Sequence, residues 1–190
     1  MEFIAALWLP IILSTFAIFI VSAFIWMATP MHTKDIKVVP DEPGLRKYLS
    51  TAQLERGLYM WPQPSDGNMN NEEFRAAYRD GPWGSVTVLN RRPSIPINLI
   101  RVLLCYLAIS VFIAWLGWTA MPNATNKTDV FVFILVAGVL GFCAGGIPNS
   151  IMFGKHPRFF LTDLIDGVIF AIVAAVLFML FWPYAPVASY

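Results

Sequence analysis

The sequence predicts an all-α membrane protein with four transmembrane helices. A small mixed α/β cap is expected between the first two helices on the cytoplasmic side, with both termini outside. Of the 190 residues, 57% are hydrophobic and only 13% are charged, whereas soluble domains carry about 25% charged residues. Four long apolar segments and an uneven distribution of basic residues complete the evidence.

The four apolar segments give the approximate helix boundaries. A helix needs about 20 residues to cross a bilayer core, and its backbone groups must bond internally there. The sequence therefore predicts transmembrane helices over residues 1–30, 98–121, 130–148 and 160–183. The first segment begins with Met-Glu rather than with basic residues, so we interpret it as a retained helix and not as a signal peptide.

The basic residues predict the orientation. Only Lys127, of 13 Lys and Arg residues, lies in the connection between the second and third helices. The others lie in or beside the first and third connections, which share one face of a four-span protein. Because basic residues accumulate on the cytoplasmic side, we expect residues 31–97 in the cytoplasm.

The cap (residues 31–97) contains two helix-like stretches, at about 42–56 and 71–80, and two possible strands, at 58–61 and 85–89. Such a short stretch provides a marginal core. It also carries four large aromatic residues that serve either as that core or as a docking surface for another protein: Tyr59, Trp61, Phe74 and Trp83.

Small residues in the third apolar segment predict close helix packing. Gly141 and Gly145 are four residues apart, and Ala137 precedes them on the same face. Small residues at this spacing let helix backbones approach closely in lipid. The contact is either internal or between subunits.

Two aspartates, Asp163 and Asp166, precede the last apolar run. The charge-free part of that segment, Val168–Trp182, is shorter than a bilayer-spanning helix needs. The helix must therefore begin earlier and include both acids near its cytoplasmic end. Because charges within a membrane tend to pair, we expect Arg101 to bridge Asp166, with Asp163 nearer the basic residues of the third connection. An ion, proton or substrate site is the alternative.

The two histidines are weak metal candidates. His32 follows the first helix and His156 precedes the fourth, so both are expected at the cytoplasmic interface. Imidazoles and carboxylates together are ligands for zinc, iron or manganese. However, no metal-binding spacing is present, so we expect no metal and no cofactor. The net charge of +1 gives no basic field for nucleic acid.

Several short motifs resemble those of a family of uncharacterised bacterial four-helix integral membrane proteins of about this length. They are LWLPIILS, FIWMATPMHTKD, VVPDE, GLYMWP, GPWGSVTV and TDLIDG. The resemblance implies a bacterial inner membrane. It carries over no activity and no catalytic residues.

Three functional hypotheses follow. The first is a non-enzymatic accessory, assembly or scaffold subunit whose partners are the bilayer and other membrane subunits or further copies of itself. The second is a small oligomeric channel or transporter with Asp163, Asp166 and Arg101 at a cytoplasmic mouth. The third is an interface enzyme or metal-binding protein that uses the two histidines and the two aspartates.

Overall fold

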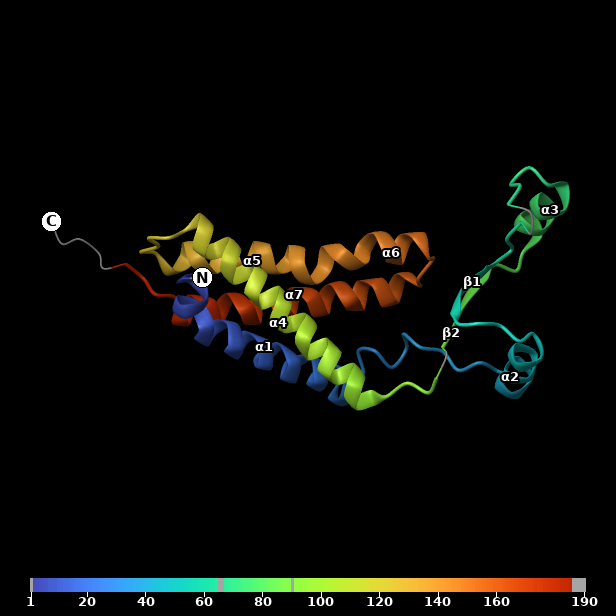
Figure 1. The fold of residues 1–190 in the computed structure, drawn as a ribbon, viewed down its shortest axis with the longest axis horizontal. Coiled ribbons are helices and arrows are strands. Elements are labelled where there is room, and N and C mark those ends of the chain that lie inside the picture. The colour runs from blue at the N-terminus through green and yellow to red at the C-terminus, as the bar shows by residue number, and fades with distance from the viewer. Residues whose placement is uncertain (1, 65–66, 90, 186–190) are drawn as a thin grey trace. The chain divides into compact units, whose positions relative to one another are not determined.

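A computed structural model describes residues 2–64, 67–89 and 91–185. The chain divides into two compact units. Unit 1 comprises residues 1–37 and 95–190, and unit 2 comprises residues 38–94. Figure 1 shows the elements of both units.

Unit 1 is a bundle of long apolar helices. Its elements are α1 (Glu2–Ala28), α4 (Ile95–Ala120), α5 (Lys127–Cys143), a short 3₁₀ turn η1 (Ala144–Gly146), α6 (Ile147–Met152) and α7 (Pro157–Phe181). Four stretches, counting Lys127–Met152 as one, are long and apolar enough to cross a membrane. Most of their side chains face outward and are apolar, which is the pattern of a multi-pass membrane protein. The predicted four apolar helices are confirmed.

The helices of unit 1 alternate in direction. Helix α7 packs against α1 and α5, and α4 also packs against both of these helices. At one end the backbone N–H of Ala185 donates to the carbonyl of Ala124 at 3.0 Å. At the opposite end a guanidinium N–H of Arg158 donates to the carbonyl of Met31 at 2.9 Å. The first and third connections therefore meet at the same end of the bundle.

Two glycines bring α5 and α7 into close contact. A Cβ added at Gly138 would lie 2.9 Å from the Cβ and 3.0 Å from the Cα of Ala171. A Cβ added at Gly167 would lie 2.5 Å from the Sγ of Cys143. Only glycine permits this approach, because the obstacles at Gly138 belong to the partner helix's backbone and first side-chain atom.

The predicted small-residue motif does not lie at the contact between α5 and α7. Gly141 faces α4, where an added Cβ would lie 3.1 Å from Ile109. Gly145 belongs to the 3₁₀ turn and has no atom within 4 Å of an added Cβ. Ala137 lines an apolar groove shared with α4. The expectation that Gly145 packs against a helix is therefore wrong for the internal contacts, since the helix ends at Cys143.

Unit 2 contains two short helices and two short strands. Helix α2 (Glu42–Thr51) begins at Asp41, whose carboxylate accepts from the N–H of Gly44. Helix α3 spans Glu72–Asp80. Strands β1 (Gly57–Trp61) and β2 (Gly84–Val88) pair antiparallel, with Tyr59 opposite Val86. The predicted mixed α/β composition, including a small two-stranded sheet, is confirmed.

Unit 2 has no fully buried side chain among its described residues. Trp61 and Trp83 are 45% and 62% exposed, and Tyr59 and Phe74 are half-buried. The core of the described chain lies in unit 1, around side chains such as Leu7, Ile18 and Phe178.

Candidate functional site

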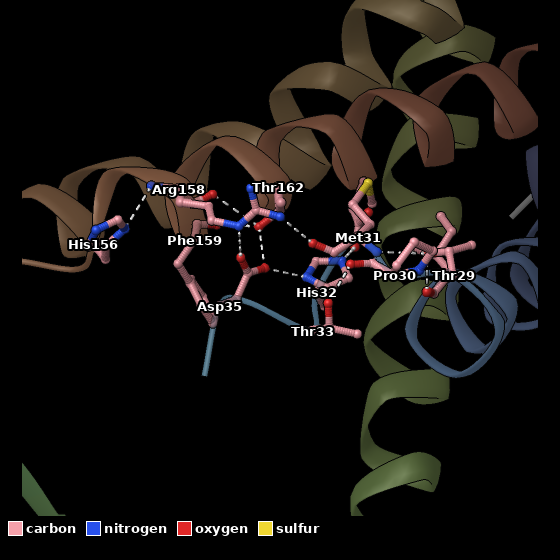
Figure 2. Close-up of polar contacts among 12 residues, drawn as sticks. Thr29, Pro30, Met31, His32, Thr33, Asp35, His156, Arg158, Phe159 and Thr162 are labelled. Carbon is pink, nitrogen blue, oxygen red and sulfur yellow. Dashed lines mark hydrogen bonds and ion pairs between the residues drawn. The ribbon is translucent and has the colours of Figure 1, made fainter. Parts of the chain in front are cut away.

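The segment after α1 folds back onto the start of α7. The hydroxyl of Thr29 donates to the carbonyl of Ile25 at 2.6 Å, and the hydroxyl of Thr33 donates to that of Pro30 at 2.8 Å. These local bonds turn the chain immediately after the helix, because Ser and Thr hydroxyls compete with the backbone for its carbonyls. The turn brings His32 and Asp35 beside Arg158 and Thr162 of α7 (Figure 2).

His32 is the centre of this cluster. It is 6% exposed, and its ring stacks on that of Trp26 with centroids 3.9 Å apart and planes 3° from parallel. Its Nδ1 lies 2.7 Å from Oδ2 of Asp35, and its Nε2 lies 3.1 Å from Oδ2 of Asp166. One imidazole thus joins the loop to the last transmembrane helix.

Asp35 is held as a carboxylate by three neighbours. The hydroxyl of Thr162 donates to its Oδ2 at 2.7 Å, and Nε of Arg158 forms an ion pair with its Oδ1 at 3.1 Å. That second contact lacks hydrogen-bond alignment, since Oδ1 has no hydrogen-bond partner. Desolvation by burial raises the pKa of Asp35, but the bonds from Thr162 and His32 and the charges of His32 and Arg158 outweigh it. The pKa therefore lies below the ordinary value of 3.8.

His32 links two carboxyl groups through its two ring nitrogens. Because Asp35 is a carboxylate, which can only accept, Nδ1 of His32 donates in that contact. The donor of the 3.1 Å contact between Nε2 and Asp166 is either the imidazole or the carboxyl group.

A cavity of about 410 Å³ is lined by Asp166 and by residues of α1, α4, α5, α6 and α7. Its lining includes both predicted aspartates, Asp163 and Asp166, together with several aromatic rings and the glycines of the 3₁₀ turn. No Lys, Arg or His is among the described residues that line it. Two carboxyl groups therefore face this space without a basic side chain.

Asp166 contacts His32 and also lines the cavity. Its side chain is 7% exposed, and its Oδ2 is the atom that contacts His32. Its Oδ1 is buried and has no hydrogen-bond partner among the described residues. Trp26 also interacts with this carboxyl group, but no well-aligned hydrogen bond from it reaches Oδ1. Buried polar atoms are almost always satisfied, so an unpaired oxygen on a carboxyl group that lines a cavity marks a candidate ligand position, although the atom itself has less than 1 Å² of accessible surface.

The expected pairing of Arg101 with Asp166 is wrong. Arg101 is exposed, and its guanidinium lies 3.5 Å from the amide oxygen of Asn98, one turn away on its own helix. His32 takes its place, because the turn after α1 carries the imidazole to Asp166. Of the two basic residues expected near Asp163, Arg158 pairs with Asp35 instead, whereas Lys155 does interact electrostatically with Asp163.

The two histidines do not form one site. The ring of His156 accepts from the N–H of Arg158 at the start of α7, and the side chain is exposed (Figure 2). In the part of the chain that the structure describes, no three His, Cys, Asp or Glu side chains are placed to hold a metal ion. The ring nitrogens of His32 point to opposite carboxyl groups, so they cannot converge with both on one ion.

The sequence contains one signal for the cluster that the motif search missed. His32 and Asp35 are three residues apart directly after a membrane helix, a spacing at which both side chains reach the same face of a turn.

Comparison of the chain with protein-family models, with curated proteins and with solved structures gives no match.

Proposed function

We propose that this protein binds a small cation at the cytoplasmic side of a bacterial inner membrane and takes part in its transport. The observation that carries the proposal is the buried, unpartnered Oδ1 of Asp166 beside a cavity of about 410 Å³. Ionisable residues inside membrane spans are costly and commonly mark ion or substrate pathways. The predicted orientation, with residues 31–97 in the cytoplasm, places this end of the bundle at the inner surface.

The contacts of Asp166 provide a mechanism. A cation in the cavity approaches the carboxyl group of Asp166, while His32 contacts its Oδ2 from outside the cavity. Asp35 and Arg158 hold the imidazole in place, so the carboxyl group keeps its position as the cation binds.

Flux into proteoliposomes tests the proposal. The full-length protein is reconstituted, and uptake of radioactive rubidium and of radioactive choline is measured against empty vesicles, with internal pyranine reporting proton movement. We expect cation uptake that Asp166→Asn abolishes and that Asp129→Asn leaves unchanged, because Asp129 lies exposed at the start of α5, outside the cavity. Equal uptake by wild type and Asp166→Asn would refute the transport role.

A second candidate function, an accessory or scaffold subunit, is favoured by unit 2. Its described residues bury no side chain, and Trp61 and Trp83 remain largely exposed. Aromatic side chains of this kind are enriched at protein interfaces. A photo-crosslinker at Trp61 or Trp83, compared with one at Lys47 of α2, tests this role in native membranes. The role is supported if the tryptophan sites alone give one adduct of defined mass at near-stoichiometric yield. The absence of such an adduct contradicts it.

A further inference from the structure

We propose that the cation bound in the cavity is an organic ammonium group, carried by a small molecule or by a lipid headgroup, rather than a metal ion. This inference rests on the proposed cation site and names its ligand class. Three features of the cavity carry it: its charge, its aromatic walls and its shortage of metal ligands.

The charge of the cavity favours a cation of modest charge. Asp163 and Asp166 line it, and no basic side chain does so among the described residues. One of the two carboxyl groups, that of Asp166, already contacts the imidazole of His32. Lys155 and His32 interact electrostatically with Asp163 from outside the lining, so the charge left on the two carboxyl groups suits a singly charged ammonium group better than a divalent ion.

The walls of the cavity are aromatic. Tyr106, Phe142 and Phe170 form a mutual cluster with centroids 5.5 to 6.2 Å apart, and Trp26 and Phe160 add two further rings. The hydroxyl of Tyr106 already donates to Ser22 at 3.1 Å. Aromatic faces attract quaternary and alkyl ammonium groups, for which aromatic cages with a nearby acid are a known solution. The volume of about 410 Å³ is that of a small-molecule pocket.

The same walls suit a metal ion poorly. Calcium takes six to eight oxygen ligands and magnesium six. The polar side-chain groups of the described lining that have no bond of their own are few: the carboxyl group of Asp163, one oxygen of Asp166 and the hydroxyl of Ser150. The thiol of Cys143 donates to the carbonyl of Leu164 at 3.7 Å. No three of the described His, Cys, Asp or Glu side chains converge. An ammonium group needs fewer directed ligands and gains from the rings instead.

Binding to the full-length protein in maltoside detergent, which contains no ammonium group, tests the inference. Isothermal titration compares choline with its uncharged isostere 3,3-dimethylbutan-1-ol, and both with rubidium, magnesium and zinc chlorides. Short-chain phosphatidylethanolamine and phosphatidylglycerol form a separate arm that distinguishes a lipid headgroup from a free solute. The variants are Asp163→Asn, Asp166→Asn, Phe160→Leu and the control Asp129→Asn.

We expect choline, or phosphatidylethanolamine alone if the source is lipid, to bind saturably while the isostere and phosphatidylglycerol do not. Asp163→Asn should weaken binding by about tenfold, as loss of one favourable charge contact would, and Phe160→Leu by a few-fold. Asp163 is half-buried and outside the His32 contacts, so its variant remains informative if Asp166→Asn does not fold. Asp129→Asn should bind as wild type does.

Three results would overturn the inference. Equal binding of choline and its uncharged isostere would show that the pocket recognises an apolar group of this shape and not its positive charge. Binding of rubidium, magnesium or zinc that depends on Asp163 or Asp166, without ammonium binding, would refute the ligand class and leave the proposed cation site intact. If no cation of either kind binds, both the ligand class and the proposed site fail.

Discussion

The two units of the molecule use their side chains in opposite ways. Unit 1 buries a continuous apolar core, and it also buries a polar cluster in which His32 contacts both Asp35 and Asp166. Unit 2 has regular helices, caps and a paired sheet, yet none of its described side chains is fully buried. Local hydrogen bonding is therefore sufficient to shape unit 2, whereas tertiary packing holds unit 1. Loss of one buried contact should therefore reduce stability far more in unit 1 than in unit 2.

The largest effect is expected from His32→Ala. The substitution leaves the Asp35 and Asp166 carboxyl groups without their shared partner and removes the stack on Trp26. Removing one partner of buried polar contacts costs about 3 kcal/mol or more. Thermal unfolding in detergent should show a melting temperature well below that of wild type.

His156→Ala is the matched control for that substitution. This exposed imidazole makes one bond, to the N–H of Arg158 at the start of α7. We expect a much smaller loss of stability. A fall as large as that of His32→Ala would show that the buried cluster is not what distinguishes unit 1.

The next effect is expected from Gly138→Ala. The added methyl group would lie 2.9 Å from the Cβ and 3.0 Å from the backbone Cα of Ala171, so α5 and α7 must separate. Overpacking of this kind costs about 1–3 kcal/mol. In contrast, Gly145→Ala adds a methyl group to open space and should change the melting temperature little. Equal effects of the two substitutions would contradict the assignment of the close contact to Gly138.

A pH-dependent effect of intermediate size is expected from Asp35. Its pKa in the folded protein lies below 3.8 because hydrogen bonds and cationic neighbours outweigh burial. A lowered carboxyl pKa stabilises the fold above the unfolded pKa, and that stabilisation disappears as the pH falls through the folded pKa. The melting-temperature difference between wild type and Asp35→Asn should therefore stay constant from pH 7 to about pH 5 and shrink only below about pH 4. A difference that disappears by pH 6 would contradict a lowered pKa.

The smallest effect is expected from Trp83→Ala in unit 2. This side chain is 62% exposed, and its indole N–H donates to the carbonyl of Tyr78 at 2.7 Å. Surface substitutions usually change stability by within about 0.5 kcal/mol. Thermal unfolding should be nearly unchanged, and a loss approaching that of His32→Ala would show that the aromatics of unit 2 stabilise the whole protein.

The sequence predicted the elements better than their contacts. Composition and segment length are sufficient to predict the four apolar helices, because an apolar run long enough to cross a bilayer has no other common explanation. The partner of Asp166 was missed since depth along the helices alone cannot rank Arg101 against His32. That choice depends on the turn after Ala28, whose hydrogen bonds involve Thr29 and Thr33.

The helix contact was misplaced for a related reason. Gly141 and Gly145 have the spacing of a packing motif, but Gly138 is one turn earlier on the face that meets α7. A single sequence does not state which face of an apolar helix meets which neighbour. The cavity could not be predicted at all, because its lining residues come from five helices that lie far apart in the sequence.

The two oxygens of Asp166 also limit how this position can change in evolution. One oxygen holds the loop through His32, while the other is free beside the cavity. Asparagine keeps the shape and can still donate its amide N–H to Nε2 of His32, but the oxygen that remains for a cation carries no full negative charge. Glutamate keeps two acceptors but moves them outward by a methylene group. A lineage that abandons the ligand should therefore tolerate asparagine here, whereas one that retains it should keep aspartate, and the identity of this single residue then reports whether the cavity is still in use.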